Sequence, residues 1–142
     1  MNFLRQISYL LLFAFLAGCS AWQQSSSSNL APSQGSALVF FYRLQGGPGA
    51  PVSVDIMDNG IDIGKLPAGA YFVYHANPGV HEFTLTTEST ARQRLQLQTG
   101  ATYYIKADVS KNPLHFRPTL GVVFELQGKT DIQQLKRIKY HE

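Results

Sequence analysis

The hydrophobic and polar positions of this chain divide it into three stretches. Residues 1–18 are mostly apolar, and residues 20–36 are rich in serine and glutamine without any apolar periodicity. From residue 37 onward, short apolar runs alternate with turn residues. We therefore expect a removable leader at 1–18, a linker at 19–36 and one folded domain at 37–142.

The pattern after residue 37 is typical of β-strands. The run LVFFYRL at residues 38–44 has apolar side chains on both alternating sets of positions, which predicts a central strand that is buried on both faces. Val52, Val54 and Ile56 alternate with polar residues, as in a half-buried strand. We expect further strands at residues 61–63, 71–76, 80–87, 95–98, 103–109 and 120–126.

Turn signals separate these runs. Asp58-Asn59-Gly60 supplies residues that tolerate a positive φ in a tight hairpin, and Asn77-Pro78-Gly79 and Thr99-Gly100 predict further turns. Residues 45–51 contain three glycines and two prolines and predict a long flexible loop. Seven or eight strands without intervening helices predict a mainly β fold, an antiparallel β-sandwich.

A short C-terminal helix is predicted after the last strand. Thr130 and Gln133 have the spacing of a capping box, in which the threonine hydroxyl accepts a bond from an early backbone N–H. Three apolar residues would pack this helix on the sandwich: Ile132, Leu135 and Ile138. The basic residues that follow, Lys136, Arg137 and Lys139, would lie where the helix dipole favours cations.

The first 19 residues resemble an export signal. Arg5 precedes an apolar run at residues 7–15, and Leu16-Ala17-Gly18 places small residues just before Cys19. This order is that of a secretory signal peptide, and the apolar run is shorter than the ~20 residues of a membrane-spanning helix. Arg5 is the only charged residue before Cys19, so the net charge of +3 belongs almost wholly to the rest of the chain.

Leu16-Ala17-Gly18-Cys19 also resembles the lipobox of bacterial lipoproteins. The resemblance implies that the Cys19 sulfur receives diacylglycerol, that further acylation with palmitate anchors the chain in a membrane, and that cleavage leaves Cys19 as the first residue. Serine rather than aspartate at position 20 implies the outer membrane, with the domain facing the periplasm. The alternative is an ordinary signal peptide with an incidental cysteine. Since the chain has one cysteine, no internal disulfide can form.

A second resemblance concerns the folded domain. Five motifs recur in the same order in one family: Val39-Phe40-Phe41-Tyr42-Arg43, Asn59-Gly60 with Ile63-Gly64-Lys65-Leu66, Tyr71-Phe72, Pro78-Gly79-Val80-His81 and Gly100-Ala101-Thr102-Tyr103-Tyr104-Ile105. Over residues 37–127 the chain resembles small bacterial lipoproteins that carry a domain of unknown function, with a pattern like that of PEGA-type and transthyretin-like sandwiches. The resemblance supports a β-sandwich and supplies no catalytic residues.

The linker, SAWQQSSSSNLAPSQGS at residues 20–36, has the composition of a flexible chain and would let the domain stand off the bilayer. Trp22 either rests at the level of the lipid headgroups or has no fixed position.

The sequence contains no combination of residues that indicates an enzyme. It has neither Gly-x-Ser-x-Gly nor a phosphate-binding glycine loop, so we expect no catalytic residues and no cofactor beyond the lipid. We expect no nucleic-acid partner, because the excess positive charge is small and the expected location is the periplasm. We expect no metal site among His75, His81, His115 and His141, because His81 and its neighbour Glu82 point to opposite faces of a strand. Asp55, Asp58 and Asp62 are interpreted as a solvated turn.

Two groups of residues are candidates for binding. Five tyrosines, Tyr42, Tyr71, Tyr74, Tyr103 and Tyr104, would stack on sugar rings or anchor a protein if one face exposed several of them. The alternative is that they fill the core. Four basic residues, Lys129, Lys136, Arg137 and Lys139, would meet anionic groups or are simply solvated. The expected function is a membrane-anchored module that binds an envelope protein; the alternative is binding of envelope glycan.

Overall fold

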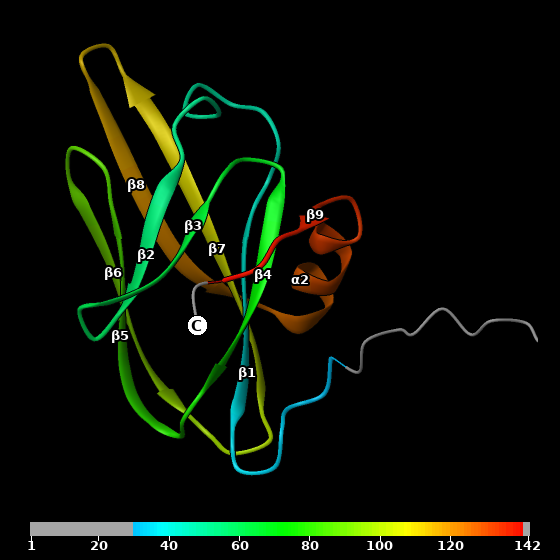
Figure 1. Ribbon diagram of the computed structural model, residues 1–142. Helices are drawn as coiled ribbons and strands as arrows, with labels where there is room; N and C mark the ends of the chain where they lie inside the picture. The colour runs from blue at the N-terminus through cyan, green and yellow to red at the C-terminus, as the bar shows by residue number, and fades with distance from the viewer. Residues whose placement is uncertain (1–29, 141–142) are drawn as a thin grey trace, which may run out of the picture.

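The computed structural model describes residues 30–140, which contain nine strands and one helix (Figure 1). The strands are β1 Ala37–Arg43, β2 Val54–Asp58, β3 Ile61–Leu66, β4 Ala70–Ala76, β5 Gly79–Thr86, β6 Thr90–Leu97, β7 Thr102–Asn112, β8 His115–Val123 and β9 Lys136–Arg137. The helix, α2, spans Glu125–Ile132.

The strands form two packed sheets, which confirms the predicted mainly β sandwich with a short helix near the C-terminus. One sheet has the order β8-β7-β1-β4-β9 and the other has the order β3-β2-β5-β6. Two pairs depart from the antiparallel pattern, because β1 pairs in parallel with β7 and β4 pairs in parallel with β9. Two neighbouring strands joined by a hairpin must be antiparallel. β1 and β7 are joined instead by a long stretch of chain that includes the other sheet, so β7 can run parallel to β1.

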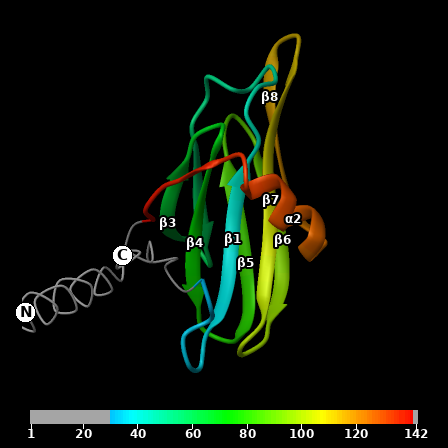
Figure 2. The same cartoon turned by 90° about the vertical axis from the view of Figure 1, so that its right-hand side faces the viewer.

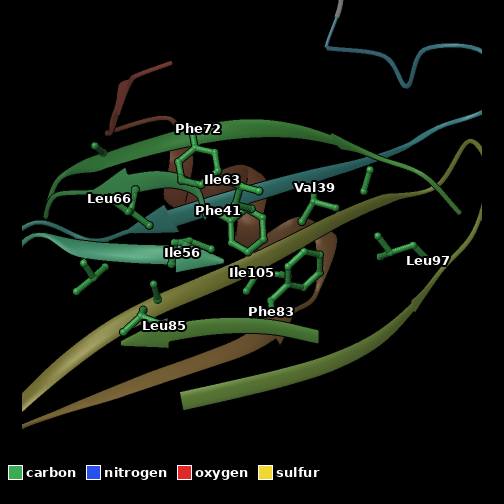
Figure 3. Close-up of a cluster of buried hydrophobic side chains, with 14 of the residues drawn as sticks. Val39, Phe41, Ile56, Ile63, Leu66, Phe72, Phe83, Leu85, Leu97 and Ile105 are labelled. Carbon is green, nitrogen blue, oxygen red and sulfur yellow. The ribbon is translucent and has the colours of Figure 1, made fainter. Parts of the chain in front are cut away.

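β1 lies in the middle of the five-stranded sheet, and all seven of its residues are buried, as the sequence predicts. Alternate residues enter two different clusters. Val39 and Phe41 point into the main core between the sheets, where the Phe41 ring lies 5.2 Å from that of Phe72 and 5.0 Å from that of Phe83 (Figure 3). Leu38 and the other alternate residues of β1 face the outer side of the same sheet.

The turns follow the sequence closely. Asn59 and Gly60 have φ values of 48° and 85° and connect β2 to β3 as a tight hairpin. The loop at residues 45–51 is also present, but it is held in place. The buried guanidinium of Arg43 donates to the carbonyl of Gly49 at 2.5 Å and to that of Val52. Gly49 fits because any Cβ there would stand 2.3 Å from the carbonyl oxygen of Val109.

The helix starts earlier than the capping box predicts. α2 begins at Glu125, so Thr130 lies in its last turn and donates its hydroxyl to the carbonyl of Leu126. Gln133 is the C-cap. The predicted capping box is therefore wrong, and so is the strand predicted to continue to Leu126. A threonine in a helix interior returns its hydroxyl to the preceding turn, which is the contact seen here.

The chain after α2 closes the open side of the sandwich. β9 pairs with the start of β4, and the backbone N–H of Ile138 donates to the carbonyl of Tyr71 at 2.8 Å. Ile138 and Tyr140 pack on the main core, whereas Ile132 and Leu135 pack on the outer cluster. All three residues predicted to share a helix face are thus packed on the sandwich, but on two different sides of it.

Candidate functional site

The outer face of the five-stranded sheet carries a second apolar cluster. Its buried members are Leu38, Phe40, Tyr42, Val73 and Tyr104. This outer cluster forms because β1 has apolar residues at both alternating sets of positions, so apolar side chains lie on both faces of the sheet. α2 covers part of this cluster as a third layer (Figure 2). Its contact is unusually close: a Cβ on Gly128 would lie 2.2 Å from the ring of Tyr104. The helix backbone therefore rests directly on that ring.

A groove of about 470 Å³ remains between α2 and the sheet. Its lining residues are Leu30, Phe40, Tyr71, Tyr104, Lys129, Ile132, Gln133 and Leu135. The ring of Phe40 stacks on that of Tyr104 at 4.8 Å and on that of Tyr71 at 6.3 Å, so the floor is aromatic. Since Leu30 precedes β1, the first described residues pass beside α2.

The five candidate tyrosines are distributed over both faces of the sheet. Tyr42 and Tyr104 are buried under α2, and Tyr71 is half-buried in the same cluster. Tyr74 and Tyr103 face the other way and pack on the main core. The hydroxyl of Tyr103 donates to the carbonyl of Gln96 at 3.3 Å. The structure thus brings Tyr71 and Tyr104 together in the groove but assembles no face that exposes all five.

A hydrogen bond from the sheet holds α2 in place. The hydroxyl of Tyr42 donates to a carboxylate oxygen of Asp131 at 2.7 Å, and the amide of Gln127 donates to the other oxygen at 2.6 Å. Burial, and then the neighbouring Asp131 carboxylate, raise the pKa of Tyr42 well above its ordinary value. Tyr42 therefore stays protonated and remains a donor to the helix.

A buried polar cluster joins the two sheets at another place. Nδ1 of His81 lies 2.7 and 2.8 Å from the two carboxylate oxygens of Asp58, and the hydroxyl of Tyr74 donates to Asp58 at 2.9 Å. Nε2 of His81 lies 2.8 Å from the carbonyl of Asn77. Both ring nitrogens of His81 therefore have a partner inside the protein: the carboxylate of Asp58 and the carbonyl of Asn77. The interpretation of Asp58 as a solvated turn residue is wrong, because it is buried.

The cluster is closed off from solvent. His81 and Asp58 are 8% and 5% exposed, and their hydrogen-bonding groups are occupied by each other, Tyr74 and Asn77. We interpret it as a structural link. Sequence reasoning missed it because the partners are 23 residues apart and no local spacing marks them.

The basic residues near the C-terminus lie in different environments. Lys129 is in the last turn of α2 and pairs with Glu125, which raises its pKa. Lys136 and Arg137 belong to β9, and Arg137 and Lys139 line a second groove of about 540 Å³. The prediction that Lys136, Arg137 and Lys139 lie at a helix C-terminus is therefore wrong, and the basic residue in the last helical turn is Lys129, which the predicted helix did not include.

Two exposed apolar residues were also missed by sequence reasoning. Phe124 is 90% exposed and Leu126 is 80% exposed at the junction of β8 and α2. The sequence pattern assigns them to a strand, where alternate residues would be buried. The signal that could have found them is Gly128, because a glycine followed by polar residues ends a strand.

Three of the histidines weighed as possible metal ligands in the sequence belong to different strands. Within residues 30–140, no three His, Cys, Asp or Glu side chains gather as metal ligands would. His81 is buried and its neighbour Glu82 is exposed, so they do point to opposite faces, as predicted. His75 lies exposed on β4 and His115 is exposed at the start of β8. His141 lies outside the described residues.

The predicted leader, Cys19, Trp22 and the linker as far as residue 29 also lie outside the described residues. Between residues 30 and 140, no helix is both long enough and apolar enough to cross a membrane. The end of the predicted linker belongs to the fold: Ser36 is buried, and its carbonyl accepts a bond from the N–H of Gly100 at 2.9 Å.

Comparison with known proteins assigns the domain to a family. A search of curated proteins finds no match. Residues 33–118 match the family DUF2846, described as a protein of unknown function. The match runs from just before β1 to the first residues of β8, so it includes β1 to β7 in full, while the rest of β8, α2 and β9 follow it. Because more than half of the 142 residues are matched, the chain belongs to the DUF2846 family.

Proposed function

We propose that this protein is a lipid-anchored lipoprotein of the bacterial envelope, and that its sandwich is a non-enzymatic module that binds an envelope protein. The observation that carries the proposal is Leu16-Ala17-Gly18-Cys19 at the end of an apolar run. A thioether-linked lipid also explains a single cysteine in an exported chain, where a free thiol would be open to oxidation.

The anchor supplies most of what such a module needs. Each acyl chain adds about 0.8 kcal/mol per buried CH₂, so two or more chains hold a protein on a membrane almost permanently. A short tether then raises the local concentration of the domain near its partner, and a weak interface is sufficient. Ser20 after the cysteine supports the outer membrane, with the sandwich in the periplasm.

The side chains that are exposed favour a protein partner over glycan. A sugar-binding platform needs open aromatic faces. Tyr42 and Tyr104 are buried, and the hydroxyls of Tyr74 and Tyr103 donate within the protein. The large apolar side chains that do reach solvent include Leu114 at the tip of the β7–β8 hairpin, which is 83% exposed. A single exposed leucine is common on protein surfaces, so Leu114 serves here as an accessible position at which to probe for a partner.

Metabolic labelling with radioactive palmitate tests the anchor. Cys19→Ala should abolish labelling and move the protein from the membrane fraction to the soluble fraction. Ser20→Ala is the matched control, because it alters the adjacent residue and keeps the cysteine; it should still be labelled. Continued labelling of Cys19→Ala would refute the proposal.

Crosslinking in intact cells separates the two kinds of partner. A photo-crosslinking residue at Leu114 should give a discrete protein adduct that mass spectrometry identifies. Retention of the purified domain on isolated cell-wall glycan, with no protein adduct, would instead support the glycan alternative.

A further inference from the structure

The start of α2 presents an apolar surface that nothing in the described chain covers. Phe124 is the N-cap residue, without a side-chain capping bond, and Leu126 follows in the first turn. The only buried residue of α2 is Gly128, which lies on Tyr104. Because the helix contacts the sheet through a glycine, its larger apolar side chains near the start point to solvent. Two adjacent apolar side chains with 90% and 80% exposure form an unpartnered patch, here called the α2 tip.

The charges next to the α2 tip are paired within the protein. Glu125, which stands between Phe124 and Leu126, pairs with Lys129, and Asp131 accepts bonds from Tyr42 and Gln127. The carboxylates of α2 are thus compensated and do not oppose an anionic bilayer surface. An aromatic and an aliphatic side chain exposed side by side are typical of segments that lie at the membrane interface.

The first described residue lies on the same side of the domain as α2. Leu30 lines the groove beside Lys129 and Ile132. Residues 30–36 and α2 lie to the right of the five-stranded sheet in Figure 1, the side that faces the viewer in Figure 2. Cys19 precedes Leu30 by eleven residues, which span at most about 40 Å when fully extended. A lipid on Cys19 therefore keeps the point where the described chain begins, which is on this side of the domain, within about 40 Å of the bilayer.

We propose that the α2 tip, Phe124 with Leu126, inserts into the interfacial region of the bilayer that holds the anchor. This inference rests on the proposed lipid anchor. Insertion fixes the outer face of the five-stranded sheet toward the membrane. The β7–β8 hairpin, which extends beyond the rest of the sandwich in both views, is then free to meet a partner (Figures 1 and 2).

Tryptophan fluorescence in vesicles tests the orientation. The lipidated full-length protein, with its single tryptophan removed by Trp22→Phe, is reconstituted into vesicles of phosphatidylethanolamine and phosphatidylglycerol that carry brominated acyl chains. Leu126→Trp and, separately, Phe124→Trp are the probes. Leu114→Trp is the matched control, since its leucine is as exposed as Leu126.

Both probes at the α2 tip should lose about half of their emission, because an interfacial segment lies ~5–10 Å deep and meets the bromines. Leu114→Trp should keep its emission. If each of the three tryptophan variants emits equally in brominated and in ordinary vesicles, the inference is overturned. It is also overturned if the α2 tip is shielded from the bromines because it contacts a second copy of the protein or a co-purified protein. Flotation of the same vesicles reports the anchor separately: protein that fails to float refutes the lipid anchor, whereas protein that floats with unquenched probes refutes only the inserted tip.

Discussion

Removing the carboxylate of Asp58 should destabilise the domain more than removing any carboxylate on its surface. Asp58 is the common acceptor for His81 and Tyr74, and it is 5% exposed. Asp58→Ala leaves the His81 ring with one nitrogen facing an empty, buried space. That nitrogen then lacks its protein partner inside the domain, which is costly for a buried polar group.

The size of the effect follows from the burial of the pair. Removing one partner of a buried hydrogen bond leaves the other group unsatisfied, which costs about 1–3 kcal/mol. The variant also loses the bond from the Tyr74 hydroxyl, which links the two sheets. For a domain whose total stability is about 5–15 kcal/mol, the loss is a large fraction. At about 2 kcal/mol per molar urea, the unfolding midpoint should fall by about 1 M.

Asp55→Ala is the matched control. Asp55 lies three residues earlier on the same strand and pairs with Lys65 at 3.4 Å on the solvent face, where such a pair contributes about 0–1 kcal/mol. Urea unfolding followed by circular dichroism compares the two variants. In the double variant Asp58→Ala/His81→Ala, the loss should be smaller than the sum of the single losses. Equal midpoints for Asp58→Ala and Asp55→Ala would refute the assignment of a buried link.

Three further outcomes are expected. Gly128→Ala should cost about 1–3 kcal/mol in thermal unfolding, because its Cβ overlaps a buried ring, whereas Gly121→Ala, with no atom within 4 Å, should cost less than about 1 kcal/mol. Phe41→Ala should cost about 3–5 kcal/mol by urea unfolding, and Ile61→Ala on the exposed hairpin less than about 1 kcal/mol; comparable losses would show that β1 is not central. Burial and then Asp58 raise the pKa of Tyr74, so its contribution is complete below the unfolded value of about 10 and declines above it. Tyr74→Phe should therefore weaken the alkaline loss of stability measured by urea unfolding at stepped pH, and an unchanged pH profile would contradict this.

The sandwich could be predicted because its signals are local. Residues 38–44 carry apolar side chains at every position but one, and β1 is buried throughout. Asn59-Gly60 imposes a hairpin through its own backbone preferences, whatever surrounds it. Even Arg43, the exception in that apolar run, is buried, because the carbonyls of the following loop fold back to meet its guanidinium.

The site could not be predicted in the same way, because it depends on contacts distant in sequence. Asp58 and His81 lie 23 residues apart, and Tyr42 and Asp131 lie 89 apart. Each residue taken alone has an ordinary surface interpretation. Only the pairing of β2 with β5, and the docking of α2 on the five-stranded sheet, bring these side chains together.

The position of α2 decides which side chains are available for binding. A helix starting near Thr130 would leave Tyr104 and Tyr42 without a cover, and the tyrosines would then be the exposed aromatic groups of the domain. Because Gly128 lets the backbone sit on Tyr104, and Asp131 accepts from Tyr42, the helix starts earlier and buries them. The same shift leaves Phe124 and Leu126 at the free start of the helix. Two of the tyrosines that the sequence marks as a binding surface are thus buried under α2, and the apolar side chains left exposed there are the two that the sequence pattern assigns to a strand.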